Sequence, residues 1–139
     1  MYERILVALD ASPADEAIIE HVGELAPIHR SQVILLRVAH SHTRDGMAHE
    51  VGESEGYLKR VAERLAAQGI PVEMVVAHGE PVEEIVSQAC ERRADLIAMS
   101  THGHRKFYDL IFGSVAEEVR HEVAIPVLLI RAPTGSGTR

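Results

Sequence analysis

At 139 residues the chain is long enough to bury a hydrophobic core, and its length favours one domain over two. Its 14 basic and 21 acidic residues give a formal net charge of −7, which argues against a broad electropositive surface for nucleic acid and leaves only local sites for phosphate. The single Cys90 excludes an intrachain disulfide, and no apolar run has the length of a signal peptide or a bilayer span, so we expect a soluble, cytoplasmic protein without membrane contacts.

The N-terminal third of the chain predicts a strand, a helix and a second strand. "RILVAL" at 4–9 is a continuous apolar run, which is typical of a strand buried on both faces. A helix over 13–28 is expected next, because Ser12 suits the N-cap and Asp15 suits the first turn. The apolar run "QVILLRVA" at 32–39 predicts the second strand.

The middle of the chain predicts a long loop, two helices and a strand. Residues 40–50 show no apolar periodicity and are expected to form a loop of functional interest. A helix over 51–68 should follow, with Gly69 as its C-cap. "PVEMVVA" at 71–77 predicts the third strand, and Pro81 suits the first position of the next helix.

The last third predicts two further strands with a helix between them. We expect Cys90 to be a buried residue of the preceding helix. Strands are expected at 94–99 and 125–131, with a helix over 114–122 between them and a disordered tail at 133–139. Five strands alternating with helices predict an α/β fold, an open, doubly wound, parallel five-stranded sheet with helices on both faces, in a single domain at 1–132.

In such a sheet, ligands bind outside the carboxyl ends of the strands, so the loops at that edge carry the functional candidates. Gly103 suits a close approach of ligand to backbone, and Gly113 with Ser114 opens the last predicted helix, whose first amide groups suit an anion. Together they suggest a phosphate site. On spacing alone, the alternative that Gly103 turns the chain and Ser114 caps a helix stays open.

Two common phosphate-binding motifs are absent from the sequence. No G-x-x-x-x-G-K-[ST] sequence occurs, which excludes a P-loop, and "DASPAD" after the first strand has no glycine, which excludes the dinucleotide fingerprint there.

The segment around these glycines resembles the nucleotide-binding signature of the universal stress protein family, G-x2-G-x9-G-[ST]. Gly103 is the second glycine, and Gly113 with Ser114 closes the signature, while Ser100 stands where the family has its first glycine. The resemblance extends over nearly the whole chain, through "ILVALDAS", "VILLRVAH", "HGEPVEEIV", "ADLIAMSTHG" and "GSVAEEVRHEVAIPVLLIR".

The resemblance implies a Rossmann-like sheet of order 3-2-1-4-5 and, in one branch of the family, a site for ATP or AMP, with Mg²⁺ as a further candidate. It places Asp10 at the ribose hydroxyls, Val38 at the adenine through its backbone, and Met99 against the nucleoside. The full set of nucleotide-binding residues that it implies is Ala8, Leu9, Asp10, Val38, Met99, Ser100, Gly103, His104, Gly113, Ser114 and Val115. For Asp10, an Asx turn is the structural alternative, and a Cβ at Ser100 is expected to narrow the ribose side of the pocket.

Histidines also gather at the predicted carboxyl edge, namely His40, His42, His78, His102 and His104. Neutral imidazoles there suit a transition metal, and protonated ones suit phosphate. The alternative is that they are separate solvated loop residues, because neither a carboxylate nor a cysteine completes an evident ligand set.

Four functions therefore compete. The leading hypothesis is a regulatory stress-response module that binds ATP or AMP without being an enzyme. The second is a slow ATPase, for which Asp10 and His104 are the nearby candidates although the chain has no lysine at a phosphate-binding position. The third is a nucleotide-free dimer that acts through protein contacts, and the fourth binds metal through the histidines. The resemblance also implies a homodimer through the last strand, at Val127, Leu128, Leu129 and Ile130.

Overall fold

Five parallel strands form one sheet in the order β3-β2-β1-β4-β5. The computed structural model describes residues 1–39, 43–101 and 110–132. The strands are β1 (Arg4–Leu9), β2 (Gln32–Ala39), β3 (Val72–His78), β4 (Leu96–Thr101) and β5 (Val127–Arg131). The expected strand order is confirmed. The carboxyl ends of β1 and β4 lie side by side, because these two strands pair in parallel. From β1 the chain continues to β2 on one side, and from β4 it continues to β5 on the other, so the strand order reverses between them.

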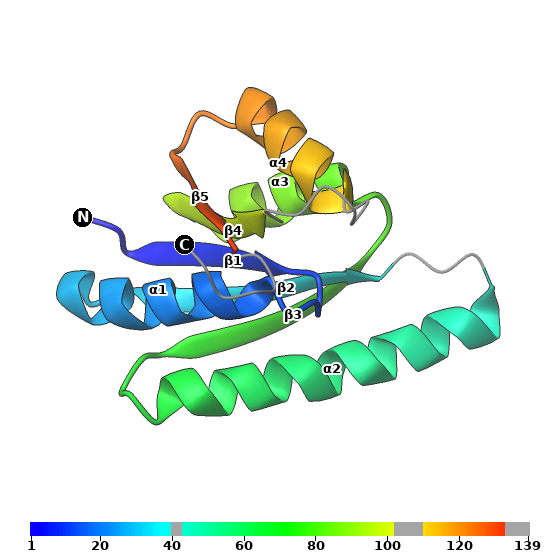
Figure 1. Cartoon of the computed structure of the whole chain (residues 1–139), viewed down its shortest axis with the longest axis horizontal. Helices are drawn as coiled ribbons and strands as arrows, with labels where there is room; N and C mark the ends of the chain where they lie inside the picture. The colour runs from blue at the N-terminus through cyan, green and yellow to red at the C-terminus, as the bar shows by residue number, and fades with distance from the viewer. Residues whose placement is uncertain (40–42, 102–109, 133–139) are drawn as a thin grey trace.

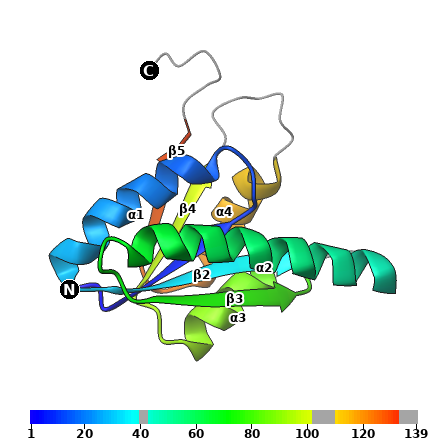
Figure 2. The same cartoon turned by 90° about the horizontal axis from the view of Figure 1, so that it is seen from below.

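Four helices cover the two faces of this sheet. They are α1 (Asp15–His29), α2 (Arg44–Ala66), α3 (Pro81–Glu91) and α4 (Leu110–Glu122). In Figure 1 the helices α3 and α4 lie above the sheet and α1 and α2 below it. The view from below in Figure 2 shows α1 and α2 in front of the sheet, running roughly along the strands that they cover. Each face therefore carries one pair of helices, as a doubly wound fold requires.

The central strand β1 shows why an uninterrupted apolar run was needed. Ile5, Val7 and Leu9 pack into the cluster on the α1/α2 face, whereas Leu6 and Ala8 pack into the cluster on the α3/α4 face. Successive side chains of a strand point to opposite faces, so a strand with helices on both sides has no polar position.

The start of α1 differs from the prediction. The helix begins at Asp15 with Ala14 as N-cap, so Ser12 is not its cap. Instead the Ser12 hydroxyl accepts a hydrogen bond from the Ala14 amide at 3.2 Å, and the Ser12 carbonyl accepts one from the Asp15 amide at 3.0 Å. The Ser-Pro pair therefore forms a turn that precedes the helix.

The predicted loop over 40–50 is mostly helix. α2 begins at Arg44, where the Thr43 hydroxyl caps it by accepting a hydrogen bond from the Gly46 amide at 2.9 Å. Residues 40–42 lie outside the described part of the chain. A polar first turn hid this start, because the apolar stripe that faces the sheet begins only further along α2.

Two predictions on the later helices are also corrected. Cys90 lies on α3 as expected, but it is exposed. α4 begins at Leu110, so Gly113 and Ser114 are inside the helix and do not open it. The tail at 133–139 lies outside the described residues. Within the described ranges, no helix is both long enough and apolar enough to cross a bilayer.

Candidate functional site

The turn after β1 is built around two aspartates. Asp10 accepts a hydrogen bond from the Ser12 amide through Oδ1 at 3.0 Å, which is an Asx turn. Ala11 has a φ of 62°, a conformation that costs a residue with a Cβ about 1–2 kcal/mol. The Asp15 carboxylate accepts from the Asp10 amide at 3.2 Å and from the Ala11 amide at 2.8 Å. Asp15 therefore stabilises the strained turn that presents Asp10 at the carboxyl edge.

Asp15 is almost completely buried, with 2% of its surface exposed. Its Oδ2 also accepts a hydrogen bond from the Tyr57 hydroxyl of α2 at 2.6 Å. Burial and, second to it, the nearby Asp10 raise the pKa of Asp15 to about 7, although the hydrogen bonds from Tyr57 and from the Asp10 amide oppose the rise. Burial and the hydrogen bond to Asp15 also raise the pKa of Tyr57. The sequence marked Asp15 only as a residue of the first helical turn, and nothing in it pairs this residue with Tyr57.

Ser100, at the end of β4, points away from the α3/α4 face. It is buried, and its hydroxyl accepts a hydrogen bond from the Ile18 amide of α1 at 3.2 Å. Its neighbour Met99 packs on the opposite face, in the same cluster as Val115 of α4. The side chain at the first signature position thus contacts α1, and its Cβ does not narrow the space beside Met99.

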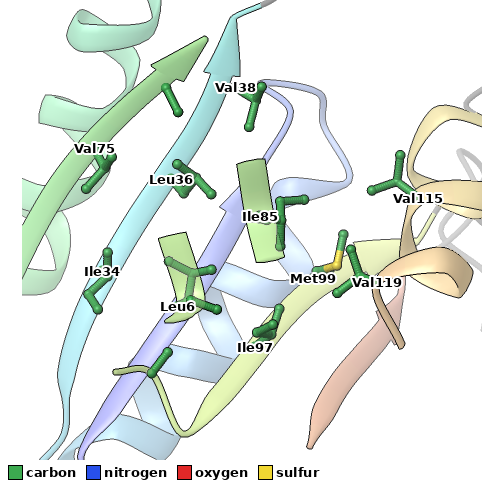
Figure 3. Close-up of a cluster of buried hydrophobic side chains, with 14 of the residues drawn as sticks. Leu6, Ile34, Leu36, Val38, Val75, Ile85, Ile97, Met99, Val115 and Val119 are labelled. Carbon is green, nitrogen blue, oxygen red and sulfur yellow. The ribbon is translucent and has the colours of Figure 1, made fainter. Parts of the chain in front are cut away.

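Four of the implied nucleotide-binding residues share the α3/α4 face of the sheet, where they form part of one buried cluster. Figure 3 shows Val38 near the end of β2, and Met99 of β4 facing α4, which contributes Val115 and Val119 to the same cluster. Ala8 of β1 belongs to the same cluster. Leu9 does not, because its side chain packs on the α1/α2 face, so only its backbone is available at this edge.

The backbone of Val38, which the resemblance places at the adenine, already has a partner. Its carbonyl oxygen accepts a hydrogen bond from Nη1 of Arg37 at 2.8 Å. A carbonyl oxygen has two lone pairs, so Arg37 occupies one of its two acceptor positions. Sequence reasoning missed Arg37, which at the sequence level is one polar residue in an apolar strand.

The phosphate side of the implied site is described only in part. Gly103 and His104 lie outside the described residues. Gly113 and Ser114 are the fourth and fifth residues of α4, and Ser114 is exposed. The prediction that Gly113 and Ser114 supply the first, free amide groups of this helix is therefore wrong.

Of the five histidines expected at this edge, the structure describes one. His78 is exposed at the end of β3, whereas His40, His42, His102 and His104 lie outside the described residues. Among the residues described, no group of three or more histidine, cysteine, aspartate or glutamate side chains is placed to hold a metal ion.

A groove of about 580 Å³ runs between α3 and α4 beside Val115. Four carboxylates line it, those of Glu80, Glu83, Glu118 and Glu122. Concentrated negative charge repels phosphate. We therefore place the candidate nucleotide site at the carboxyl edge, between the β1 turn and the end of β4, and not in this groove.

This arrangement defines a doubly wound α/β protein whose candidate site lies where the carboxyl ends of β1 and β4 meet. Residues 1–131 match the profile of the Universal stress protein family, and the chain belongs to this family.

Curated relatives match over almost the whole chain. Universal stress protein YxiE of Bacillus subtilis is 29% identical, with 94% of this chain and 100% of the relative covered. Universal stress protein MJ0577 of Methanocaldococcus jannaschii is also 29% identical, over 94% of this chain and 96% of the relative.

Solved structures show the same fold. The structure of MJ0577 aligns with a TM-score of 0.83 at 26% identity, covering 97% of this chain and 99% of that one. A universal stress protein from Archaeoglobus fulgidus, solved in complex with dAMP, aligns with a TM-score of 0.71 at 25% identity, covering 93% of this chain and 98% of that one.

Proposed function

We propose that the chain is a regulatory module of the stress response that binds ATP or AMP at the carboxyl edge of β1 and β4 as a homodimer. The orientation of Ser100 carries this proposal. Because its hydroxyl accepts a hydrogen bond from the Ile18 amide, the residue that departs from the glycine signature points to α1 and away from the face that carries Met99 and Val115. The relative from Archaeoglobus fulgidus, solved with dAMP, supports an adenine nucleotide as the ligand.

The proposed contacts follow from the placement of the described residues. Asp10 accepts hydrogen bonds from the ribose hydroxyls, the backbone of Val38 meets the adenine, and Met99 packs against the nucleoside. Ala8, Val115 and the backbone of Leu9 complete the nucleoside side of the site. Ser100 lies on the opposite face of β4 and joins this strand to α1 through its hydrogen bond with the Ile18 amide. Gly103, His104, Gly113 and Ser114 are proposed for the ribose and phosphates. Mg²⁺ is proposed only as a companion of the phosphates when ATP is bound.

The dimer is proposed through β5, which is an edge strand of the sheet. Val127, Leu128 and Ile130 are half-buried in the single chain, and Leu129 is exposed. An edge strand with an apolar side chain exposed is a ready surface for pairing with a second copy.

One observation favours a second candidate, a nucleotide-free dimer that acts through protein contacts. Arg37 occupies one acceptor position of the Val38 carbonyl, and its positive charge disfavours the approach of another hydrogen-bond donor such as the adenine amino group. Under this alternative the carboxyl edge of β1 and β4 has the shape of a nucleotide site but binds no nucleotide.

The deciding experiment is to extract the purified full chain with heat, identify any released nucleotide by mass spectrometry, and then titrate the chain with AMP, ATP and Zn²⁺ by calorimetry. Adenine nucleotide in the extract, or heat of binding with AMP or ATP, supports the proposal. A dimer without either result supports the nucleotide-free alternative. Binding of Zn²⁺ alone favours the histidine hypothesis, and release of ADP and phosphate from bound ATP favours the slow ATPase.

A further inference from the structure

The turn after β1 holds an unfavourable backbone conformation at the candidate site. Among the described residues, three that are not glycine have a positive φ: Ala11, Arg30 and Arg93. Arg30 and Arg93 follow the ends of α1 and α3, where a left-handed residue commonly ends a helix. Ala11 has no such role, because it lies between β1 and α1. Something else must stabilise its conformation, and such strain is typical of sites that bind a ligand.

The stabilising group is the Asp15 carboxylate. It accepts the amides of Asp10 and Ala11 at 3.2 and 2.8 Å, so it fixes both peptide groups that set the direction of the Asp10 side chain. Asp15 is itself held by the Tyr57 hydroxyl at 2.6 Å, which comes from a different helix 42 positions along the chain. Three donors therefore converge on one buried carboxylate.

Tyr57 can hold Asp15 in place because α2 is well anchored. The neighbouring Leu58 is completely buried in the core. About two turns further along α2, Arg64 forms a double hydrogen bond with Glu16 of α1, at 3.0 and 2.5 Å. The position of the Tyr57 hydroxyl is thus set by the packing of α2 against the sheet and by its contact with α1.

We propose that Asp15 and Tyr57 are positioning residues of the nucleotide site, which hold the Asp10 turn in the shape that recognises the ribose hydroxyls and make that recognition depend on the placement of α2. This inference rests on the proposed function. Neither residue touches the nucleotide: Asp15 acts through the backbone of the turn, and Tyr57 acts through Asp15. A change that moves α2 is therefore expected to weaken the recognition of the ribose hydroxyls more than the contacts with the adenine.

The test compares AMP with 2′,3′-dideoxy-AMP, which lacks both ribose hydroxyls. The two dissociation constants are measured by calorimetry on the full chain, and their ratio reports ribose recognition alone. Tyr57→Phe removes the hydroxyl that holds Asp15 and keeps the ring. Tyr2→Phe is the matched control, because Tyr2 lies near the opposite, amino edge of the sheet and packs against His29. Asp10→Ala gives the ratio that is left without the ribose ligand, and Asp15→Asn is a second variant should Tyr57→Phe fold poorly.

We expect the wild type to prefer AMP by roughly tenfold or more, as hydrogen bonds to a charged group imply. Tyr57→Phe and Asp15→Asn should lower this ratio roughly three- to tenfold, toward that of Asp10→Ala, mainly by weakening AMP. Tyr2→Phe should keep the ratio.

Two results overturn the inference while leaving the proposed function in place. In the first, the ratio is unchanged in both Tyr57→Phe and Asp15→Asn. In the second, the affinity for both ligands falls equally, which indicates a purely structural role. If the wild type binds neither ligand, the proposed function is wrong and this inference falls with it.

Discussion

The buried Asp15 predicts that the protein loses stability as the pH rises from 5 to 8. Its pKa is raised from 3.8 to about 7 in the folded state, mainly by burial and then by Asp10. Between these two values the folded protein binds a proton that the unfolded chain has released. The unfolding free energy contributed by this proton is fully present below pH 3.8 and is lost as the pH rises through about 7.

The size of the effect follows from the pKa difference. A shift of roughly three units corresponds to about 4 kcal/mol in total. Most of this range lies between pH 5 and pH 8, where the linkage relation gives a loss of about 2–3 kcal/mol in the free energy of unfolding. Screening by solvent reduces this free energy only slightly, because Asp15 is only 2% exposed.

The assay is urea denaturation of the wild type and of Asp15→Asn at pH 5, 6, 7 and 8. Asparagine does not titrate, so the difference between the two curves isolates the contribution of Asp15 from that of the groups common to both proteins. Glu16, whose pKa is lowered by Arg64, changes protonation below 4.5 and lies outside the range. The wild type should lose about 2–3 kcal/mol relative to the variant between pH 5 and 8. Parallel curves would refute the argument that burial keeps Asp15 protonated.

Four substitutions test the site and the dimer. Ser100→Gly should cost about 1–2 kcal/mol in urea denaturation, since the α1 amide loses its partner, and should leave the AMP dissociation constant within about twofold; a tenfold gain in affinity would mean that the serine narrows the site after all. Gly113→Val should abolish AMP binding in calorimetry with little loss of thermal stability, because valine is not worse than glycine inside a helix, and an unchanged affinity would place the phosphates elsewhere. Arg37→Met should tighten AMP binding roughly two- to tenfold by freeing the strand carbonyl, whereas no change would show that the second lone pair suffices. Leu129→Asp, at a position 37% exposed on β5, should yield monomers in light scattering. Met74→Asp, at a position 49% exposed on the opposite edge strand β3, is the control and should leave the dimer intact. Two variants of equal mass would count against β5 as the interface.

The sequence predicted the strands well because burial on both faces leaves a strong local pattern. The run from Arg4 to Leu9 was predicted to the residue, and the other strands were predicted to within about two residues. Helix starts were predicted less well. α2 begins at Arg44, where a polar first turn does not show the apolar stripe that marks a helix packed on a sheet. α4 begins at Leu110, before the Gly-Ser pair at 113–114 that suggested the start of a helix. Ser12 and Pro13 form a common helix start, yet here they form the turn before it.

The neighbourhood of the candidate residues was predictable, but their contacts were not. The expected strand order brings the ends of β1 and β4 together, so Asp10 and Met99 lie on adjacent strands. Side-chain direction was not predictable for Ser100, since only the register of β4 decides which face it meets. The contact of Tyr57 with Asp15 joins residues 42 positions apart, and no local pattern encodes it.

The contacts of Ser100 and of Asp15, neither of which was predicted from the sequence, both lie at the beginning of α1. Ser100 binds the Ile18 amide, and Asp15, the first residue of the helix, binds the turn after β1 and the hydroxyl of Tyr57. The N-terminal turn of α1 is therefore joined to β4, to the β1 turn and to α2. A glycine at position 100 would remove the first of these three connections and gain no space on the Met99 face. In this chain the serine is thus better explained as part of the support of the site than as an obstruction within it.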